Sequence, residues 1–179
     1  MHVRSTLALV TILAAGPAAQ AAELNVGDKA PDFKLAASDG KTYSLADFKG
    51  KKAVVIAWFP RAFTQGCTVE CKSLAASGDK IRKYDVAYFM ASVDPVEGEK
   101  GNKAFAESEK ADFPMLSDPT REVAAAYGVL NTERGVATRW TFYIDKNGTI
   151  AAIDKAVKPP TSAEDMIAKL AELKVPAAR

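Results

Sequence analysis

Cys67 and Cys71 are the only two thiols in this chain of 179 residues, and they stand four residues apart at the end of one segment, residues 59–71. The apolar run before this segment, residues 53–58, is typical of a buried strand, and the residues that follow Cys71 favour a helix. The pattern therefore places Cys67 near a helix N-terminus, where unpaired N–H groups and the helix dipole favour a thiolate. Because a free cysteine with a pKa of ~8.5 is only about 3% ionised at pH 7, this position would supply a nucleophile.

The spacing of Pro60, Thr64 and Cys67 resembles the active-site loop of the peroxiredoxin family, and the context of Cys67 is most similar to the Q (bacterioferritin-comigratory) subgroup. In that family a Pro, a Thr and the peroxidatic Cys enclose the peroxide. The resemblance implies that Pro60 shields the loop and that the Thr64 hydroxyl holds the thiolate together with a peroxide oxygen. Arg139, in an Arg-x-Thr-Phe context, matches the family's active-site arginine. Its guanidinium would stabilise the thiolate and the charge on the departing oxygen.

Glu70 and Cys71 each leave two interpretations open. Glu70 is either a first-turn residue favoured by the helix dipole or the partner that orients an arginine. Cys71 is either a resolving cysteine or a packing residue, and the Q subgroup often has its resolving cysteine five residues after the first. In an intact helix, residues four apart have Cβ atoms about 5–6 Å apart, whereas a disulfide needs about 4.5 Å or less. A Cys67–Cys71 bridge would therefore require the first helical turn to unwind.

The activity that the resemblance implies is that of a thiol peroxidase acting on hydrogen peroxide or alkyl hydroperoxides. The Cys67 thiolate would attack the O–O bond and become a sulfenic acid, and Cys71 would condense with it to a disulfide. An external thiol donor, either a thioredoxin-like protein or a small thiol, would reduce that disulfide. No metal, haem or flavin is implied, and both monomers and homodimers occur in the family. Full ionisation of Cys67 raises the rate at most ~30-fold, so transition-state stabilisation from Thr64 and Arg139 is also required.

Two other functions are compatible with a pair of cysteines in a thioredoxin-like domain. The Cys-x3-Cys spacing also resembles the Sco-type copper chaperones, which use a distant histidine as third ligand. The only histidine here, His2, lies in an N-terminal segment that we expect to be removed. A thioredoxin-type disulfide oxidoreductase uses Cys-x-x-Cys, which is one residue shorter than the spacing observed here.

The N-terminus has the pattern of a signal peptide. A short basic region is followed by the apolar run 7–15 and by Ala19-Gln20-Ala21, an Ala-x-Ala cleavage site. The apolar run is far shorter than the ~20 residues of a membrane-spanning helix, so we expect cleavage after Ala21 and no membrane anchor afterwards. The protein is then periplasmic or secreted, and residues 22–179 remain.

Composition sets broader limits on the function. With 48% hydrophobic residues, the segment 22–179 is long enough for one globular domain with its own core. The formal net charge is only +2, and basic residues are interspersed with acidic ones, which gives no electrostatic support for a nucleic-acid partner. Two cysteines are too few for a disulfide-stabilised scaffold.

Apolar strands alternate with helices along the chain, which predicts an α/β layer fold. The resemblance to peroxiredoxins, which covers nearly all of residues 22–179, implies a thioredoxin-like fold with a central mixed sheet flanked by helices and an N-terminal hairpin. The expected strands are 33–36, 41–43, 53–58, 86–93, 113–116, 138–144 and 149–153. The first expected helix runs from the cysteines to about Tyr84, with a weak point at Gly78, and the second covers 101–110. The third runs from a cap at Asp118 to Gly128, with Val123, Ala126 and Tyr127 facing inward. The last runs from a cap at Ser162 to Leu173.

Overall fold

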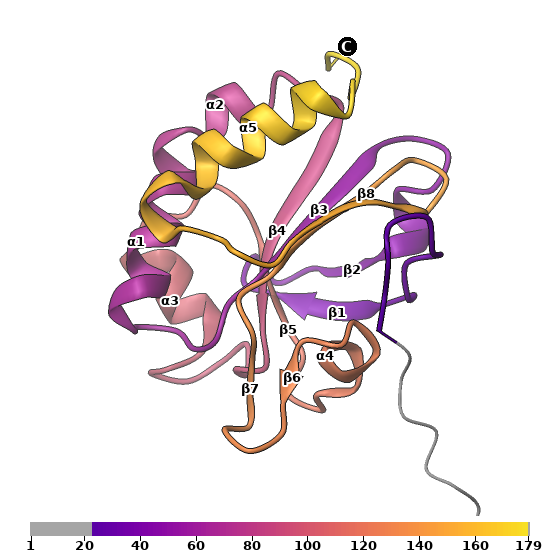
Figure 1. Cartoon of the computed structure of the whole chain (residues 1–179). Helices are drawn as coiled ribbons and strands as arrows, with labels where there is room; N and C mark the ends of the chain where they lie inside the picture. The colour runs from indigo at the N-terminus through magenta and orange to yellow at the C-terminus, as the bar shows by residue number, and fades with distance from the viewer. Residues whose placement is uncertain (1–22, 179) are drawn as a thin grey trace, which may run out of the picture.

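The computed structural model describes residues 23–178, and the polypeptide is shown in Figure 1. The signal peptide and its cleavage site, which the sequence predicts at residues 1–21, lie outside the described residues. Within residues 23–178, no helix has both the length and the apolar composition needed to cross a membrane.

A seven-stranded mixed sheet forms the centre of the molecule, in the order β2-β1-β5-β4-β3-β8-β9. The three strands at its centre, β3, β4 and β5, are parallel, and the outer strands pair antiparallel. The strands are β1 (Lys34–Ala37), β2 (Thr42–Ser44), β3 (Ala53–Trp58), β4 (Val86–Ser92), β5 (Met115–Ser117), β8 (Thr141–Ile144) and β9 (Ile150–Asp154), with a separate hairpin of β6 (Leu130–Asn131) and β7 (Val136–Ala137).

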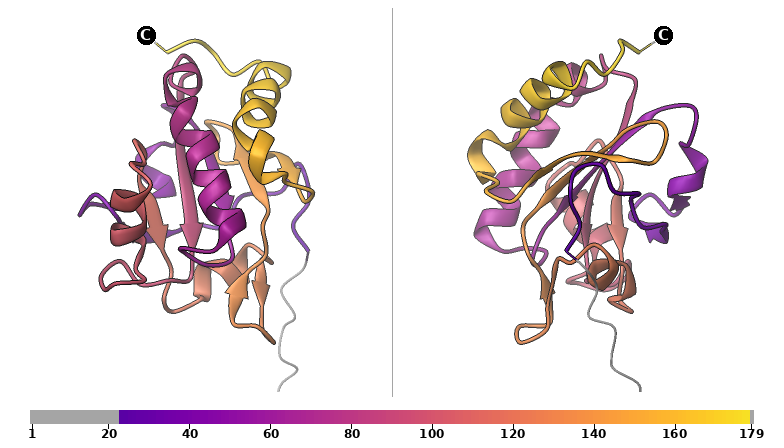
Figure 2. Two further views of the ribbon diagram at one scale, coloured as in Figure 1. Left: turned by 90° about the vertical axis from the view of Figure 1, so that its left-hand side faces the viewer. Right: turned by 45° about the vertical axis from the view of Figure 1, so that its right-hand side comes forward.

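Both faces of the sheet are buried, because successive side chains of β3 alternate between two apolar clusters. Four helices cover one face, and Figure 2 shows two of them, α1 and α5, side by side in front of the sheet. The other face is covered by α4 and by the short 3-10 helix η1. The predicted α/β fold with a mixed sheet between helices and an N-terminal hairpin is confirmed. The helices are η1 (Leu45–Asp47), α1 (Gln65–Ala76), α2 (Gly78–Ile81), α3 (Asn102–Ser108), α4 (Glu122–Ala126), η2 (Pro159–Thr161) and α5 (Ser162–Glu172).

The helix that follows the cysteines is divided at the glycine that the sequence marks as its weak point. α1 ends at Ala76, and a separate short helix, α2, begins at Gly78. A Cβ atom at Gly78 would lie 2.2 Å from Asp112 Oδ2, so no larger residue fits there without displacing that carboxylate. The absence of a side chain at Gly78 therefore makes room for the carboxylate of Asp112.

The expected start of α4 is wrong by several residues. Asp118 does not cap the helix in the ordinary way, because α4 begins only at Glu122. The Asp118 carboxylate instead accepts a hydrogen bond from the backbone N–H of Ala124, inside the first turn, at 2.7 Å. The later start also changes the inward face: Tyr127 is buried as predicted, but Ala126 is exposed and Ala124 is buried in its place.

Candidate active site

Cys67 is the third residue of α1 and is completely buried. The helix begins at Gln65, and Thr64 before it has an extended backbone whose carbonyl accepts the N–H of Thr68 at 2.9 Å. The Cys67 thiol therefore lies in the first turn, where backbone N–H groups have no partner within the helix. This is the position that the sequence predicts for it.

Arg139 lies just before β8 and reaches Cys67 from there. The backbone N–H of Trp58 donates to the carbonyl of Trp140 at 2.9 Å, which extends the β3–β8 pairing to the last residue of β3. This pairing brings Arg139 beside the loop that follows β3. Its Nη2 donates to Cys67 Sγ at 3.1 Å, and its side chain is only 18% exposed. A fixed positive charge in contact with the sulfur stabilises negative charge there.

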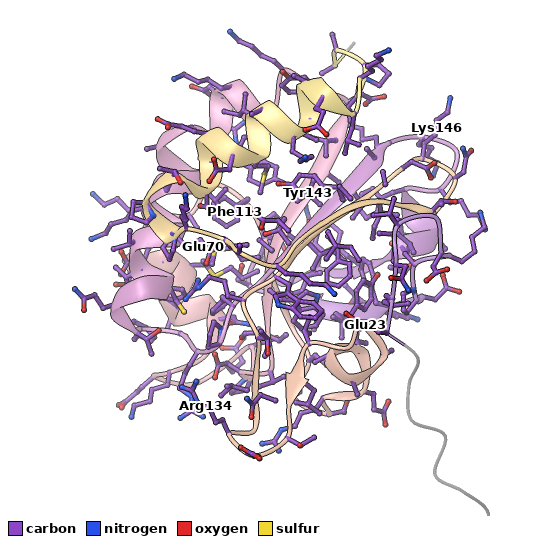
Figure 3. All side chains as sticks on the ribbon, in the orientation of Figure 1. Glu23, Glu70, Phe113, Arg134, Tyr143 and Lys146 are labelled. Carbon is purple, nitrogen blue, oxygen red and sulfur yellow. The ribbon has the colours of Figure 1, made fainter. Side chains whose placement is uncertain are left out.

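Glu70, which is labelled in Figure 3, forms an ion pair with Nη1 of the same guanidinium. Its side chain is 1% exposed. Residues three apart share one face of a helix, so Cys67 and Glu70 both point towards Arg139. One end of the guanidinium is thus bound to Glu70 and the other end contacts the sulfur. Of the two interpretations of Glu70, this ion pair agrees with the second, in which Glu70 is the partner of an arginine.

Thr64 and Pro60 lie in the loop between β3 and α1. Pro60 is partly buried and Thr64 is exposed. The Thr64 hydroxyl donates to the carbonyl of Arg61 at 2.9 Å, and no bond from it to Cys67 is present among the described residues. The contact implied by the family resemblance is therefore not formed here, because a carbonyl in the same turn takes the hydroxyl proton.

Cys71, one turn after Cys67, belongs to the apolar core between the helices and the sheet. It is completely buried, and both cysteines are free thiols. Burial raises the pKa of the Cys71 thiol to about 12, with smaller contributions from the negative charges of Glu109 and Asp112. In this conformation Cys71 is a neutral packing residue.

Gly66 is a site residue that the sequence analysis did not single out. A Cβ atom there would lie 3.2 Å from Arg139 Nη2, closer than an ordinary van der Waals contact. The absence of a side chain lets the guanidinium approach the first turn of α1. A glycine directly before the cysteine is the one signal in the sequence that marks this approach.

Asp94 was also missed, because it is separated from the cysteines by a helix and a strand. It follows β4, and its carboxylate accepts a hydrogen bond from the backbone N–H of Ala62, in the cysteine loop, at 2.8 Å. The local sequence shows only an acidic residue after a buried strand.

No cluster of three or more His, Cys, Asp or Glu side chains able to hold a metal ion occurs in residues 23–178. The two thiols thus have no third ligand beside them in that part of the chain. This gives the copper-binding interpretation no structural support.

A sequence profile of the AhpC/TSA family matches residues 26–153, which is most of the chain. This chain belongs to the peroxiredoxin (AhpC/TSA) family. Alkyl hydroperoxide reductase E of Mycobacterium tuberculosis is 37% identical over 129 residues, which cover 71% of this chain and 82% of that protein. Peroxiredoxin Bcp of Escherichia coli is 35% identical over 133 residues, which cover 71% of this chain and 83% of that one.

Solved peroxiredoxin structures share the fold. The crystal structure of peroxidoxin BcpB from Mycobacterium tuberculosis matches with a TM-score of 0.75 at 27% identity, and the match covers 84% of this chain and 98% of that one. The predicted thioredoxin-like fold is confirmed, and so is the predicted enzyme class: this peroxiredoxin is an oxidoreductase of the peroxidase type.

Proposed function

We propose that this peroxiredoxin reduces hydrogen peroxide or organic hydroperoxides at Cys67 and regenerates the thiol through a Cys67–Cys71 disulfide. The observation that carries the proposal is the shared guanidinium of Arg139, which is bound to Glu70 at one end and lies 3.1 Å from Cys67 Sγ at the other. A fixed positive charge beside the sulfur supports the proposal, because it would stabilise the charge on a departing peroxide oxygen. The names of the relatives support a peroxide as substrate.

In the first step, the Cys67 thiolate attacks one oxygen of the peroxide and the O–O bond breaks. The attacked oxygen stays on sulfur as a sulfenic acid, and the other leaves as water or an alcohol once it has gained a proton. Arg139 Nη2, already beside the sulfur, stabilises the charge that develops on the leaving oxygen. Pro60 and Thr64 form the wall of the loop on the substrate's side, and the Thr64 hydroxyl would exchange its bond to Arg61 for one to the substrate.

In the second step, Cys71 attacks the sulfenic sulfur, a disulfide forms and water leaves. Two features of the folded helix oppose this step. The spacing of the two residues leaves their Cβ atoms about 5–6 Å apart, and burial holds the pKa of Cys71 at about 12. Unwinding the first turn of α1 removes both obstacles, since it brings the sulfurs together and exposes Cys71 to solvent. An external thiol donor, a thioredoxin-like protein or a small thiol, then reduces the disulfide.

The proposal includes export through the N-terminal signal peptide, which places the enzyme in the periplasm or outside the cell. The measurement is the N-terminal sequence of the protein recovered from a cell envelope fraction. Cleavage after Ala21 is expected, and an intact Met1 on the functional enzyme would contradict it.

The test of the first step is stopped-flow mixing of the reduced protein with hydrogen peroxide or cumene hydroperoxide. The fluorescence of Trp58, which is buried at the end of β3, serves as the signal. Wild type should consume peroxide rapidly, and Cys67→Ser should consume none while it keeps its circular dichroism spectrum. Turnover by the folded Cys67→Ser variant would refute the proposal.

A further inference from the structure

The loop between β3 and α1, residues 59–64, carries Pro60 and Thr64 and forms one side of the site. At its start, the backbone N–H of Phe59 donates to the carbonyl of Ala91 at 2.9 Å. Further on, the N–H of Ala62 donates to Asp94 Oδ2 at 2.8 Å. Among the hydrogen bonds of the described residues, this one joins the second half of the loop to the segment that follows β4, whereas the Thr64 carbonyl bonds to α1.

Asp94 is itself attached to a buried polar cluster at the ends of β4 and β5. Ser92 Oγ lies 3.0 Å from Asp94 Oδ2 and 3.1 Å from Asn102 Oδ1. The side-chain amide of Asn102 donates to the carbonyl of Leu116 at 3.0 Å and to Ser117 Oγ at 2.9 Å. Ser92 and Asn102 are completely buried. The single proton of the Ser92 hydroxyl can be donated to only one of Asp94 Oδ2 and Asn102 Oδ1 at a time, while Ser92 Oγ also accepts the backbone N–H of Asp94 at 3.1 Å. These buried contacts restrict the position of the Asp94 carboxylate.

The residue after Ala62 shows why the loop needs such an attachment. Phe63 has a φ of 61°, in the left-handed region, where a bulky side chain costs on the order of 1–2 kcal/mol. Its ring packs 5.2 Å from that of Phe105 on α3, the helix whose first residue is Asn102. A strained conformation persists only where its surroundings impose it, and here Asp94 binds the residue before Phe63 while Phe105 of α3 packs against the Phe63 ring.

We propose that Asp94 is a positioning residue for peroxide reduction, and that its bond to the Ala62 N–H holds Pro60 and Thr64 where they enclose the substrate. The inference rests on the proposed function of Cys67. Arg139 does not depend on Asp94, since it reaches Cys67 and Glu70 of α1 from the β8 side. Loss of the Asp94 contact should therefore impair the reaction with peroxide and leave the thiolate of Cys67 unchanged.

The experiment compares two reactions of Cys67 in a full-length Cys71→Ser background, where only one thiol is present. One is the stopped-flow reaction with hydrogen peroxide, and the other is alkylation by iodoacetamide as a function of pH. Asp94→Ala should slow the peroxide reaction about 10-fold, the scale of a displacement of somewhat under 1 Å in a reacting geometry. Its alkylation rate and pH profile should match those of the parent.

Asp94→Asn tests whether a hydrogen-bond acceptor is what matters. The amide oxygen of Asn can accept from Ala62 N–H and from the Ser92 hydroxyl in the place of Oδ2, so the peroxide rate should return to within about 3-fold of the parent. A variant as slow as Asp94→Ala would overturn the positioning role.

Asp118 supplies a matched control. It follows the neighbouring strand β5, and its carboxylate likewise accepts one backbone N–H, from Ala124 at 2.7 Å, and one hydroxyl, from Thr120 at 3.0 Å. Asp118→Ala should lower the melting temperature and leave the peroxide rate of the folded protein unchanged. If Asp118→Ala slows the reaction as much as Asp94→Ala, the effect is a general loss of structure and the inference fails.

Failure of the inference is distinguishable from failure of the proposed function. A wild-type protein that does not react with peroxide refutes the proposed function. A reactive wild type with an equally reactive Asp94→Ala variant refutes only the role of Asp94. Faster amide exchange at Ala62 in Asp94→Ala, measured without peroxide, is expected in support, and unchanged exchange there would contradict the contact itself.

Discussion

Cys67 and Cys71 lie one turn apart on the same helix, are equally buried and belong to the same apolar cluster, yet a guanidinium contacts only the sulfur of Cys67. Cys67 Sγ accepts a hydrogen bond from the guanidinium of Arg139. Cys71 faces the apolar core, and its acidic neighbours, Glu109 and Asp112, add to the effect of burial on its pKa. Exposure therefore does not distinguish the two thiols. The contact of the Arg139 guanidinium with Cys67 Sγ does.

This difference also predicts an order of events. In the proposed mechanism, Cys67 would react with peroxide in the folded helix, because Arg139 already contacts its sulfur and Pro60 and Thr64 lie in the adjacent loop. Cys71 would react only after the first turn of α1 has opened, since only then would it leave the core. In this mechanism the fold promotes the first step, peroxide reduction at Cys67, and opposes the second, disulfide formation by Cys71.

Replacing Cys71 by Ser should have the largest effect on this comparison, because it removes the second step entirely. After one equivalent of peroxide, intact-mass analysis should find a sulfenic acid in the variant and a loss of two hydrogens in wild type. Excess peroxide should then drive the variant faster to sulfinic acid. Amide exchange over residues 67–71 should rise on oxidation of wild type only. If oxidised wild type keeps a sulfenic acid and forms no Cys67–Cys71 disulfide, Cys71 is a packing residue. An external thiol then reduces the sulfenic acid of Cys67.

Replacing Arg139 by Ala removes the charge that distinguishes the surroundings of Cys67, and it should slow the peroxide reaction by about 10²-fold. The variant leaves Glu70 buried without its partner and could therefore unfold. In that case the rate is measured on the double variant Arg139→Ala with Glu70→Gln, which has no unpaired buried charge. Arg134, an exposed residue on the turn between β6 and β7, is the matched control (Figure 3). Arg134→Ala should react like wild type. A folded Arg139→Ala variant with the wild-type rate would show that another group stabilises the leaving oxygen.

The surroundings of Cys71 should appear in the pH dependence of stability. Below pH ~8.5 the thiol is protonated in both the folded and the unfolded chain, so its favourable burial is fully present. As pH rises from there to about 12, the unfolded chain ionises first, and the free energy of unfolding should fall by about 1.4 kcal/mol per pH unit. Cys71→Ala should lose this slope in urea unfolding between pH 8 and 10 under reducing conditions. The buried tyrosines also contribute to this slope, but they contribute equally in wild type and in Cys71→Ala. Equal slopes in the two proteins would therefore contradict the raised pKa of Cys71.

The sequence alone predicts the structure correctly where a feature depends on neighbouring residues. The apolar run 53–58 is β3 at its predicted bounds, and Cys67 lies in a first helical turn because a loop and a helix former flank it. It was insufficient where distant segments meet. The partner of Glu70 depends on the β3–β8 pairing, which brings Arg139 across from 69 residues further along the chain.

The remaining differences from the expectations have separate causes. α4 starts late because Arg121 adopts a left-handed conformation, with a φ of 66°, that no local propensity indicates. The Thr64 hydroxyl binds the Arg61 carbonyl, although the family pattern implies a contact with Cys67. Asp94 was not recognised because its hydrogen-bond donor is the backbone N–H of Ala62, which lies 32 residues earlier in the chain.

Gly66→Ala should give the smallest effect and the sharpest test of the contact between α1 and Arg139. The new Cβ would lie 3.2 Å from Nη2, so the guanidinium must move by a few tenths of an ångström, away from the sulfur that it contacts. Such a displacement should slow the peroxide reaction by about 3-fold. Stability should stay the same or rise, because the backbone of Gly66 is helical and Ala is the better helix former. Gln65→Ala, an exposed neighbour in the same turn, is the control and should leave the rate unchanged. A Gly66→Ala variant that is more stable and fully active would mean that the guanidinium has room to move, and that its 3.1 Å contact with Cys67 is not set by the close approach at Gly66.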